Sequence, residues 1–235
     1  MIDKAKLKEE AAEYNIILTE EQLEKFALYG EFLKEYNEFV NLTAITDDEG
    51  IRIKHFLDSI LLFDAVGGGG KTIADVGSGA GFPGVPYKIV NPDCSLYCIE
   101  PTGKRVEFLK KLSEKLGIEI NAVNIRAEDA ARKPELREQF DIVTARAVKE
   151  MRELSELCLP LVKVGGVFAP LKGPDAPEEM ASAKNALRLL SGEKTAIKEY
   201  VLPDESKRNI VLIKKISQSS AKYPRIYSKI KKNPL

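Results

Sequence analysis

The sequence is poor in cysteine and histidine, carries no net charge and contains no long apolar run. Three cysteines among 235 residues are too few for a disulfide framework. The longest apolar runs are far shorter than a bilayer crossing requires, and the first residues lack the apolar core of a signal peptide. We therefore expect a cytoplasmic protein without a membrane partner.

The charge that is present is distributed unevenly along the chain. Lysine and arginine total 36, and aspartate and glutamate also total 36. Residues 1–50 hold 13 acidic and 5 basic residues, whereas residues 206–235 hold 9 basic residues and no acidic one. Such asymmetry indicates either an anionic partner for the basic end or a tail that packs on its own domain.

Four consecutive glycines at positions 67–70 suggest a division of the chain. Before them, apolar residues at helical spacing predict helices over 3–13, 20–40 and 51–63. Thr19 and Gln22 fit a capping box at the start of the second helix. We predict a helical N-terminal extension over residues 1–66 and a second unit over residues 67–235.

After the glycines, short apolar runs alternate with amphipathic stretches. The expected strands cover 72–76, 95–100, 118–123, 140–145, 166–171, 196–202 and 209–216, and the expected helices cover 85–90, 103–116, 150–159 and 177–190. This alternation predicts an α/β fold, with a mostly parallel seven-stranded sheet covered on both faces. No helix separates the last two strands, so we expect them to pair antiparallel, which gives one reversed strand near the C-terminal edge.

A glycine-rich loop, D-V-G-S-G-A-G-F-P-G at 75–84, directly follows the first strand. Counted from Gly79 it satisfies the dinucleotide pattern G-x-G-x-x-G, but this frame begins two residues late. Counted from Asp75 it reads D-x-G-x-G-x-G, the pattern of S-adenosylmethionine-dependent methyltransferases. The Asp75 carboxylate would face a ligand with an amino group and repel a bare pyrophosphate. A turn without a ligand is the alternative.

Three more strand ends carry candidate ligand-binding residues. Glu100, the last residue of the second strand, is expected to bond ribose hydroxyls, although a solvated charge would also fit. Ala127 and Glu128, after the third, would meet an adenine amine, although acidic residues also favour a helix start. Arg146, after the fourth, is a donor and a cation that would position an electron-rich base beside the transferring methyl group; a surface salt bridge is the alternative.

Distinctive segments cover nearly the whole chain and give it a family resemblance. They are Y-N-E-F-V-N-L-T-A-I at 36–45, K-H-F-L-D-S at 54–59, the glycine loop at 75–84, K-R-V-E-F-L at 104–109, R-A-E at 126–128, R-A at 146–147, L-K-G at 171–173 and Y-P-R at 223–225. With these segments the chain resembles the bacterial 16S rRNA guanine-N7 methyltransferases, formerly called glucose-inhibited division protein B. General methyltransferases lack the first two segments.

The resemblance implies the class I, Rossmann-like methyltransferase fold with the helical extension packed on it. It implies methyl transfer from S-adenosylmethionine to N7 of one guanine in 16S rRNA, with S-adenosylhomocysteine as product. It adds a cofactor contact for Arg146, whose catalytic role we expect from its position at the end of the fourth strand. The expected cofactor-binding residues are Asp75, Gly77, Gly79, Phe82, Glu100, Ala127, Glu128 and Arg146.

One departure and one chemical point qualify this expectation. The family commonly has Asp-Ser after the second strand, whereas this chain has Glu100-Pro101-Thr102. Guanine N7 has a free lone pair and loses no proton before attack, so methylation there needs no dedicated general base. The enzyme would act by holding the reacting atoms in line.

Basic residues near the C-terminus predict an RNA-binding surface. We expect RNA contacts from Lys172, Lys222 and Arg225, and base stacking on Tyr223 and Tyr227. For the lysines at 214 and 215, protection of an edge strand against aggregation is an equally good explanation. The expected partner is 16S rRNA, in the 30S subunit or an assembly intermediate. No coiled-coil seam indicates an oligomer, so we expect a monomer.

The remaining reactive side chains do not indicate further chemistry. His55 falls outside the expected sheet-end site, so we predict a structural role for it in the extension. Cys94 and Cys98 lack a second ligand pair, which argues against a metal site, and Cys98 should be buried in its strand. Two other functions stay open: an NAD-dependent oxidoreductase using the late glycine frame, and a non-catalytic RNA-binding protein that keeps a degenerate methyltransferase fold.

Overall fold

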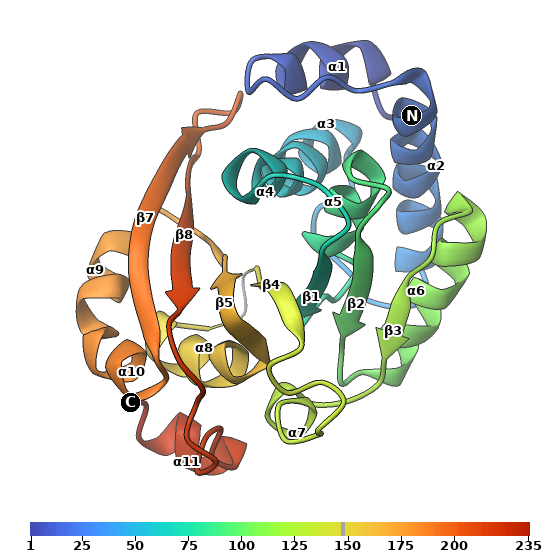
Figure 1. Ribbon diagram of the computed structural model, residues 1–235. Coiled ribbons are helices and arrows are strands. Elements are labelled where there is room, and N and C mark those ends of the chain that lie inside the picture. The colour runs from blue at the N-terminus through green and yellow to red at the C-terminus, as the bar shows by residue number, and fades with distance from the viewer. Residues whose placement is uncertain (147–148) are drawn as a thin grey trace.

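A mostly parallel sheet with helices on both faces forms the centre of the molecule (Figure 1). The computed structural model describes residues 1–146 and 149–235, so Ala147 of the arginine motif lies outside the described residues. Within them the sheet has eight strands: seven follow the order β3-β2-β1-β4-β5-β8-β6, and the eighth, β7, pairs with β8. Both β5 and β7 pair antiparallel with β8, so β8 is the one reversed strand that the sequence predicted.

The helices and strands have the following bounds. The N-terminal part contains α1 (Lys4–Ala12), α2 (Glu20–Asn37), α3 (Asp48–Gly50), a π-helix (Ile51–Leu57) and α4 (Asp58–Val66). The strands are β1 (Thr72–Val76), β2 (Ser95–Ile99), β3 (Asn121–Val123), β4 (Phe140–Thr144), β5 (Val162–Phe168), β6 (Leu171–Lys172), β7 (Gly192–Val201) and β8 (Lys207–Lys215). The later helices are α5 (Gly84–Val90), α6 (Gly103–Leu116), α7 (Ala127–Ala130), α8 (Met151–Cys158), α9 (Ala176–Ser182), α10 (Lys184–Leu189) and α11 (Tyr227–Lys232).

The register of the central strands aligns the ends that carry the candidate site residues. Asp75 of β1 pairs with Cys98 of β2 on one side and with Thr144 of β4 on the other. Because the three strands are parallel, the segments that follow them emerge at the same edge of the sheet. The glycine loop, Glu100 and Arg146 are therefore neighbours.

Two hydrophobic clusters lie on opposite faces of the sheet. Successive strand residues alternate between them: Ile73 belongs to the first cluster, and Ala74 belongs to the second. Buried residues of α1, α2, the π-helix and α4 share the first cluster with α5, α6 and the sheet, whereas α8, α9 and α10 contribute to the second. The N-terminal helices thus pack directly on the sheet, and the division at 67–70 stays a prediction.

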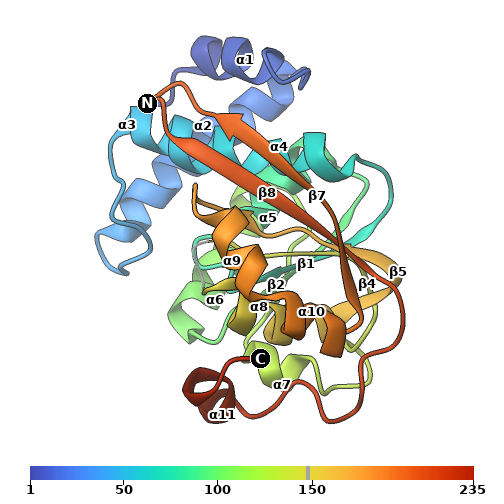
Figure 2. The ribbon, with the colours of Figure 1, turned by 90° about the vertical axis from the view of Figure 1, so that its left-hand side faces the viewer.

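The N-terminal region also contacts the far end of the chain. The β7–β8 hairpin extends beyond the sheet towards α1 (Figure 2). There Tyr14 donates a hydrogen bond of 2.6 Å to the Val201 carbonyl. At the start of α2, Thr19 and Gln22 form the predicted capping box. The π-helix was not predicted, because apolar periodicity does not distinguish it from an α-helix.

Several predicted elements differ in extent, for local reasons. Gly117 ends α6 in a left-handed conformation, and Ile118 then bonds back to Ser113, so β3 begins only at Asn121. Pro170 cannot donate to a ladder and separates β5 from β6, which turns the predicted fifth strand into two. The helix expected over 177–190 is two helices, α9 and α10.

The location of β8 corrects the edge-strand explanation for its lysines. Lys214 pairs with Val167 of β5 and with Glu193 of β7, so β8 lies inside the sheet. Lys215 is fully buried, and its ammonium group donates to the Leu159 carbonyl and pairs with Glu138. Burial lowers the pKa of Lys215 to about 8. Neither protection of an edge nor RNA contact explains Lys215.

In the part of the chain that the structure describes, the helices lack the length and apolarity needed to cross a membrane.

Candidate functional site

Close packing explains two glycines of the loop at 75–84. Gly81 has φ +95°, and a Cβ there would lie 2.8 Å from the Tyr29 hydroxyl. That hydroxyl donates a hydrogen bond to the Ala80 carbonyl, which ties the loop to α2. A Cβ on Gly84 would lie 2.9 Å from Cβ of Asp75. Glycine at these two positions allows the loop to pack closely against α2 and β1.

Asp75 lies beneath the loop with no exposed surface. One carboxylate oxygen accepts a 2.8 Å hydrogen bond from the Gly84 amide at the start of α5. The other oxygen is buried and has no hydrogen-bond partner among the described residues. Burial raises the pKa of Asp75 to about 7, although the Gly84 amide and Arg146 oppose the shift. The expectation that this carboxylate faces a ligand is therefore not met directly, because the loop covers it.

Glu100 connects the end of β2 to the same loop. Its carboxylate accepts hydrogen bonds from the Gly79 amide at 3.0 Å and from the Thr102 amide at 2.9 Å. It is 2% exposed, so the alternative of a solvated strand-end charge is wrong. A carboxylate has about four acceptor positions, so Glu100 keeps capacity for further donors.

Ala127 and Glu128 form the first turn of the short helix α7. Glu128 is buried and accepts a 2.8 Å hydrogen bond from Nε of Arg126. The structure thus agrees with a helix start at this position. Because β2 and β3 are parallel, the segments that follow them emerge at the same edge of the sheet, so the pair lies on the same side of the sheet as Glu100.

Phe82 is enclosed by three side chains from different parts of the chain. Its ring stacks on Tyr29 with centroids 5.2 Å apart and on His55 with centroids 4.5 Å apart. The Arg146 guanidinium carbon lies 4.8 Å from the ring centroid. The residue is only 6% exposed, so most of its surface is covered by the protein itself.

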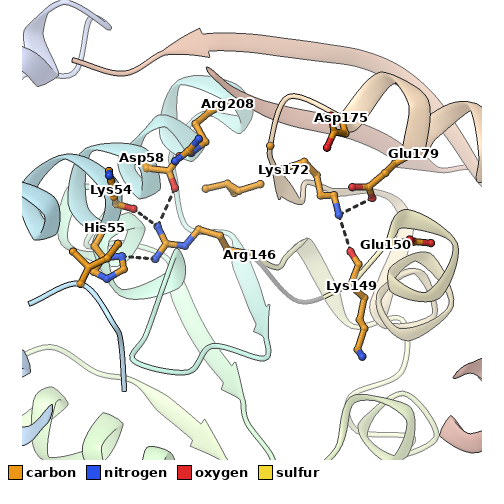
Figure 3. Close-up of a pocket in the computed structure, with 13 residues that line it drawn as sticks. Lys54, His55, Asp58, Arg146, Lys149, Glu150, Lys172, Asp175, Glu179 and Arg208 are labelled. Carbon is orange, nitrogen blue, oxygen red and sulfur yellow. Dashed lines mark hydrogen bonds and ion pairs between the residues drawn. The ribbon is translucent and has the colours of Figure 1, made fainter. Parts of the chain in front are cut away.

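Arg146 is held by the K-H-F-L-D-S segment of the N-terminal extension. Nη1 donates to the Lys54 carbonyl at 2.8 Å, to Asp58 at 2.9 Å and to the Ser59 hydroxyl at 3.3 Å. Nη2 lies 3.1 Å from Nδ1 of His55 (Figure 3). The predicted salt-bridge alternative is thus present, but the pair is largely buried: the side chain of Arg146 is 14% exposed and that of Asp58 is 5% exposed.

His55 is therefore part of the site, and its predicted position outside it is wrong. Because Arg146 is always a donor, Nδ1 of His55 must accept, and the proton lies on Nε2. Nε2 is 2.8 Å from Oγ1 of Thr43, in the N-L-T-A-I segment. Burial and the nearby Arg146 cation lower the pKa of His55 to about 3, so the imidazole is neutral at pH 7. Sequence spacing gave no signal of this contact, since 91 residues separate the partners.

Asp58 balances two arginines that converge from distant elements. In addition to Arg146, it faces Nε of Arg208 on β8 at 3.6 Å. Burial raises the pKa of Asp58, and the two arginines counteract this shift. The carboxylate therefore joins the extension, the end of β4 and β8 at one point.

A cavity of about 620 Å³ opens beside this cluster (Figure 3). Its charged lining comprises five basic residues, Lys54, Arg146, Lys149, Lys172 and Arg208, and four acidic residues, Asp58, Glu150, Asp175 and Glu179. Ile45, His55, Leu171 and Gly173 complete the wall. The glycine loop does not line this cavity, and Phe82 together with Arg146 connects the two regions. The site thus has two neighbouring parts.

The residues predicted to contact RNA have three different environments. Lys172 lines the cavity, where it pairs with Glu179 at 2.7 Å. Lys222 is exposed above the Tyr223 ring. Arg225 binds the buried Glu156 carboxylate, with Nη2 to oxygen at 2.6 Å.

Two further expectations have clear outcomes. Base stacking on Tyr223 is wrong, because this side chain is only 6% exposed and belongs to the second hydrophobic cluster. Burial of Cys98 is confirmed, and Cys94 and Cys158 are also buried free thiols. Among the residues that the structure describes, no cluster of histidine, cysteine and acidic side chains has the arrangement of a metal site.

Comparison with known proteins adds to this geometry. The family model described as GidB, rRNA small subunit methyltransferase G, matches residues 22–211. The chain is 46% identical over 231 residues to the ribosomal RNA small subunit methyltransferase G of Lactobacillus johnsonii, with 96% of this chain and 97% of that protein covered. For the Clostridium botulinum protein of the same name, identity is 46% over 233 residues, with 96% and 95% covered.

Solved structures confirm the predicted fold. A SAM-dependent methyltransferase from Aquifex aeolicus superposes with a TM-score of 0.51 at 22% identity, covering 71% of this chain and 93% of that one. At this identity the similarity supports the fold alone.

Proposed function

Because the chain belongs to the rRNA small subunit methyltransferase G family, we propose that it transfers a methyl group from S-adenosylmethionine to N7 of a guanine in 16S rRNA. The observation that carries the proposal is the contact of the glycine loop with the charged cavity through Phe82 and Arg146. The substrate is the 30S subunit or an assembly intermediate, which agrees with a cytoplasmic location. A monomer suffices, since one chain supplies both parts of the site.

The residues at the strand ends fit the methyl donor. A Cβ on Gly79 would meet only the Gly77 carbonyl, at 3.9 Å, so the loop leaves open space there. Glu100 keeps acceptor capacity for ribose hydroxyls next to that space, and the start of α7 at Ala127 and Glu128 fits an adenine edge. S-adenosylmethionine supplies an electrophilic methyl group when bound. Asp75 supports this site indirectly, by holding the Gly84 amide beneath the loop.

The cavity provides the acceptor side of the reaction. Its volume of about 620 Å³ lies in the range of small-molecule sites and is sufficient for a flipped-out nucleotide. Both ring nitrogens of His55 are engaged, by Arg146 and by Thr43, so His55 is not available as a general base. This fits N7 of guanine, because the attacking lone pair carries no proton. Catalysis then depends on positioning the base.

Arg146 is the residue that we assign to this positioning. Its guanidinium is fixed on one side by the Lys54 carbonyl, Asp58 and His55. A planar donor group held in this way presents its remaining N–H groups in a constant direction. We expect these groups to contact acceptors of the guanine or the adjacent phosphate. The N-terminal extension thus sets the orientation of a residue at the end of β4.

Ligand binding separates this function from the oxidoreductase alternative. Isothermal titration calorimetry with S-adenosylhomocysteine should show binding at one site per chain, and NAD should show none. Binding of NAD without binding of S-adenosylhomocysteine would refute the proposed cofactor. A degenerate, non-catalytic protein would bind RNA but fail to transfer labelled methyl groups to small-subunit rRNA.

A further inference from the structure

An aromatic residue of the C-terminal segment is flanked by two cations from other parts of the chain. Tyr227 begins α11, and the Arg126 guanidinium carbon lies 5.2 Å from its ring centroid. The Lys149 ammonium lies 5.5 Å from the same centroid. A ring with cations at these distances is a favourable arrangement in proteins, and it is also the composition of surfaces that bind nucleic acid bases and phosphates.

The two cations mark the two parts of the candidate site. Arg126 directly precedes Ala127 and Glu128, the pair assigned to the adenine edge. Lys149 lines the acceptor cavity, and Figure 3 shows its side chain extending away from Lys172 while its carbonyl receives the Lys172 ammonium. Tyr227 therefore lies beside the rim of the site.

Carboxylates of the described residues neutralise only part of the positive charge of this cluster. Arg126 pairs with Glu128 through Nε, and its side chain is 54% exposed. Lys149 forms no ion pair with a carboxylate in residues 1–146 and 149–235. Tyr227 is partly buried against the second hydrophobic cluster, and part of the residue is exposed. A group that carries negative charge and a flat π-surface complements this combination.

The C-terminal segment is held firmly enough to present the ring in one place. Arg225 binds Glu156, whose side chain has no exposed surface. Arg132 donates to the Pro224 carbonyl at 2.9 Å, and Arg152 donates to the Leu235 carbonyl at 2.8 Å. These contacts come before and after α11, so the platform is preorganised.

We propose that Tyr227, Arg126 and Lys149 bind a nucleotide of single-stranded RNA that flanks the target guanine. The base stacks on Tyr227, and the two cations contact its phosphate. This inference rests on the proposed function, because it names an additional substrate subsite of the same enzyme. Two residues of the C-terminal segment then have different roles: Arg225 anchors the segment, and Tyr227 contacts the substrate.

Substitutions at the platform test the proposal with two independent binding measurements. Tyr227→Ala should raise the Kd for small-subunit rRNA, measured by filter binding, by about 10-fold, because a stacked base is lost. Tyr227→Phe keeps the ring and should bind rRNA like the wild type. The Kd for S-adenosylhomocysteine, measured by calorimetry, should stay within about 2-fold in both variants, which excludes a role on the cofactor side.

The cations give a second test that leaves the Tyr227 side chain itself unchanged. Arg126→Gln and Lys149→Gln should each flatten the dependence of log Kd on log salt concentration by about 0.7, the value for one single-strand phosphate contact. Lys115→Gln is the matched control, since Lys115 is exposed at the C-terminal end of α6, near the opposite edge of the sheet. Its salt dependence should equal that of the wild type.

The opposite results would overturn the inference. Unchanged rRNA affinity in Tyr227→Ala and unchanged salt slopes in both glutamine variants would show that the cluster only packs the tail. Loss of S-adenosylhomocysteine affinity in Tyr227→Ala would place the ring in the cofactor site. Failure of the proposed function would instead appear as absent methyl transfer by the wild type, and the rRNA affinities would still test the platform.

Discussion

Replacement of Asp75 by asparagine should make the unliganded protein more stable at alkaline pH. Asp75 is fully buried, one oxygen has no partner among the described residues, and its pKa is raised from 3.8 to about 7. The folded state therefore holds the proton more tightly than the unfolded state. Stability from this group is full below about pH 4 and falls as pH rises towards 7, the reverse of an ion-paired carboxylate.

The pKa difference sets the size of the effect. About three pKa units correspond to about 4 kcal/mol of lost stability at pH 8, and about 3 kcal/mol of that loss develops between pH 5 and pH 8. Asparagine keeps the acceptor for the Gly84 amide and removes the charge, but its amide N–H₂ meets the unpartnered position and costs about 1–3 kcal/mol. The net gain expected at pH 8 is about 1–3 kcal/mol.

Urea denaturation of the wild type and the variant at pH 5 and pH 8 measures this difference directly. The stability advantage of Asp75→Asn should grow by about 3 kcal/mol between the two values, whereas the exposed Asp93→Asn serves as a control with no such change. Parallel pH profiles for the wild type and Asp75→Asn would refute the buried, proton-binding carboxylate. Asp75→Ala should also fold, but it should lose methyl transfer because the Gly84 amide of the loop loses its carboxylate acceptor.

Three further substitutions probe other contacts of the site and the tail. Arg146→Lys keeps the positive charge but loses the planar guanidinium, so single-turnover methylation should slow about 100-fold, while the affinity for S-adenosylhomocysteine should stay within a few-fold. An unchanged rate would show that Arg146 does not position the base. Gly84→Ala should lower the free energy of unfolding by about 1–3 kcal/mol in urea, because its Cβ would lie 2.9 Å from Asp75; wild-type stability would show that the loop can relax. Arg225→Ala removes the guanidinium from the buried Glu156 carboxylate and leaves it only the backbone amide of residue 225, so it should cost about 3 kcal/mol by the same assay. A loss of rRNA affinity at full stability would favour direct RNA contact instead.

Local patterns predicted most of the sheet. The bounds of β1 and α6 agree with the prediction at both ends, because a strand bounded by glycine and an amphipathic helix closed by Gly117 are decided by nearby residues. The antiparallel pairing of β7 with β8 followed from the short connection between them. Pro170 is the sequence signal for the split of the fifth strand, since proline cannot donate to a ladder.

Side-chain partners across the fold could not be predicted in this way. His55 lies in an apolar helical segment, and nothing near it in the sequence indicates that it bonds Arg146. Lys215 and Tyr223 are in a basic stretch that favours an exposed RNA surface, yet both are buried because Glu138 and the second hydrophobic cluster receive them. Such contacts depend on tertiary packing, which composition and periodicity do not encode.

The same limit applies to Asp75 and Glu100. The sequence identified both as functional candidates from their positions at the ends of strands, but it assigned their carboxylates to a ligand. In the structure each carboxylate first bonds a loop amide, of Gly84 and of Gly79 respectively. The family pattern therefore selects two residues that support the loop, and their assignment to a ligand stays a prediction.

The most direct test of the account is methyl transfer to defined RNA. Purified protein should transfer labelled methyl groups from S-adenosylmethionine to small-subunit rRNA from cells that lack this protein, and mass spectrometry of the digested RNA should identify one 7-methylguanosine. Arg146→Lys should give the same product more slowly. Absence of transfer to naked RNA, to 30S subunits and to assembly intermediates, or a methyl group on any atom other than guanine N7, would contradict the account.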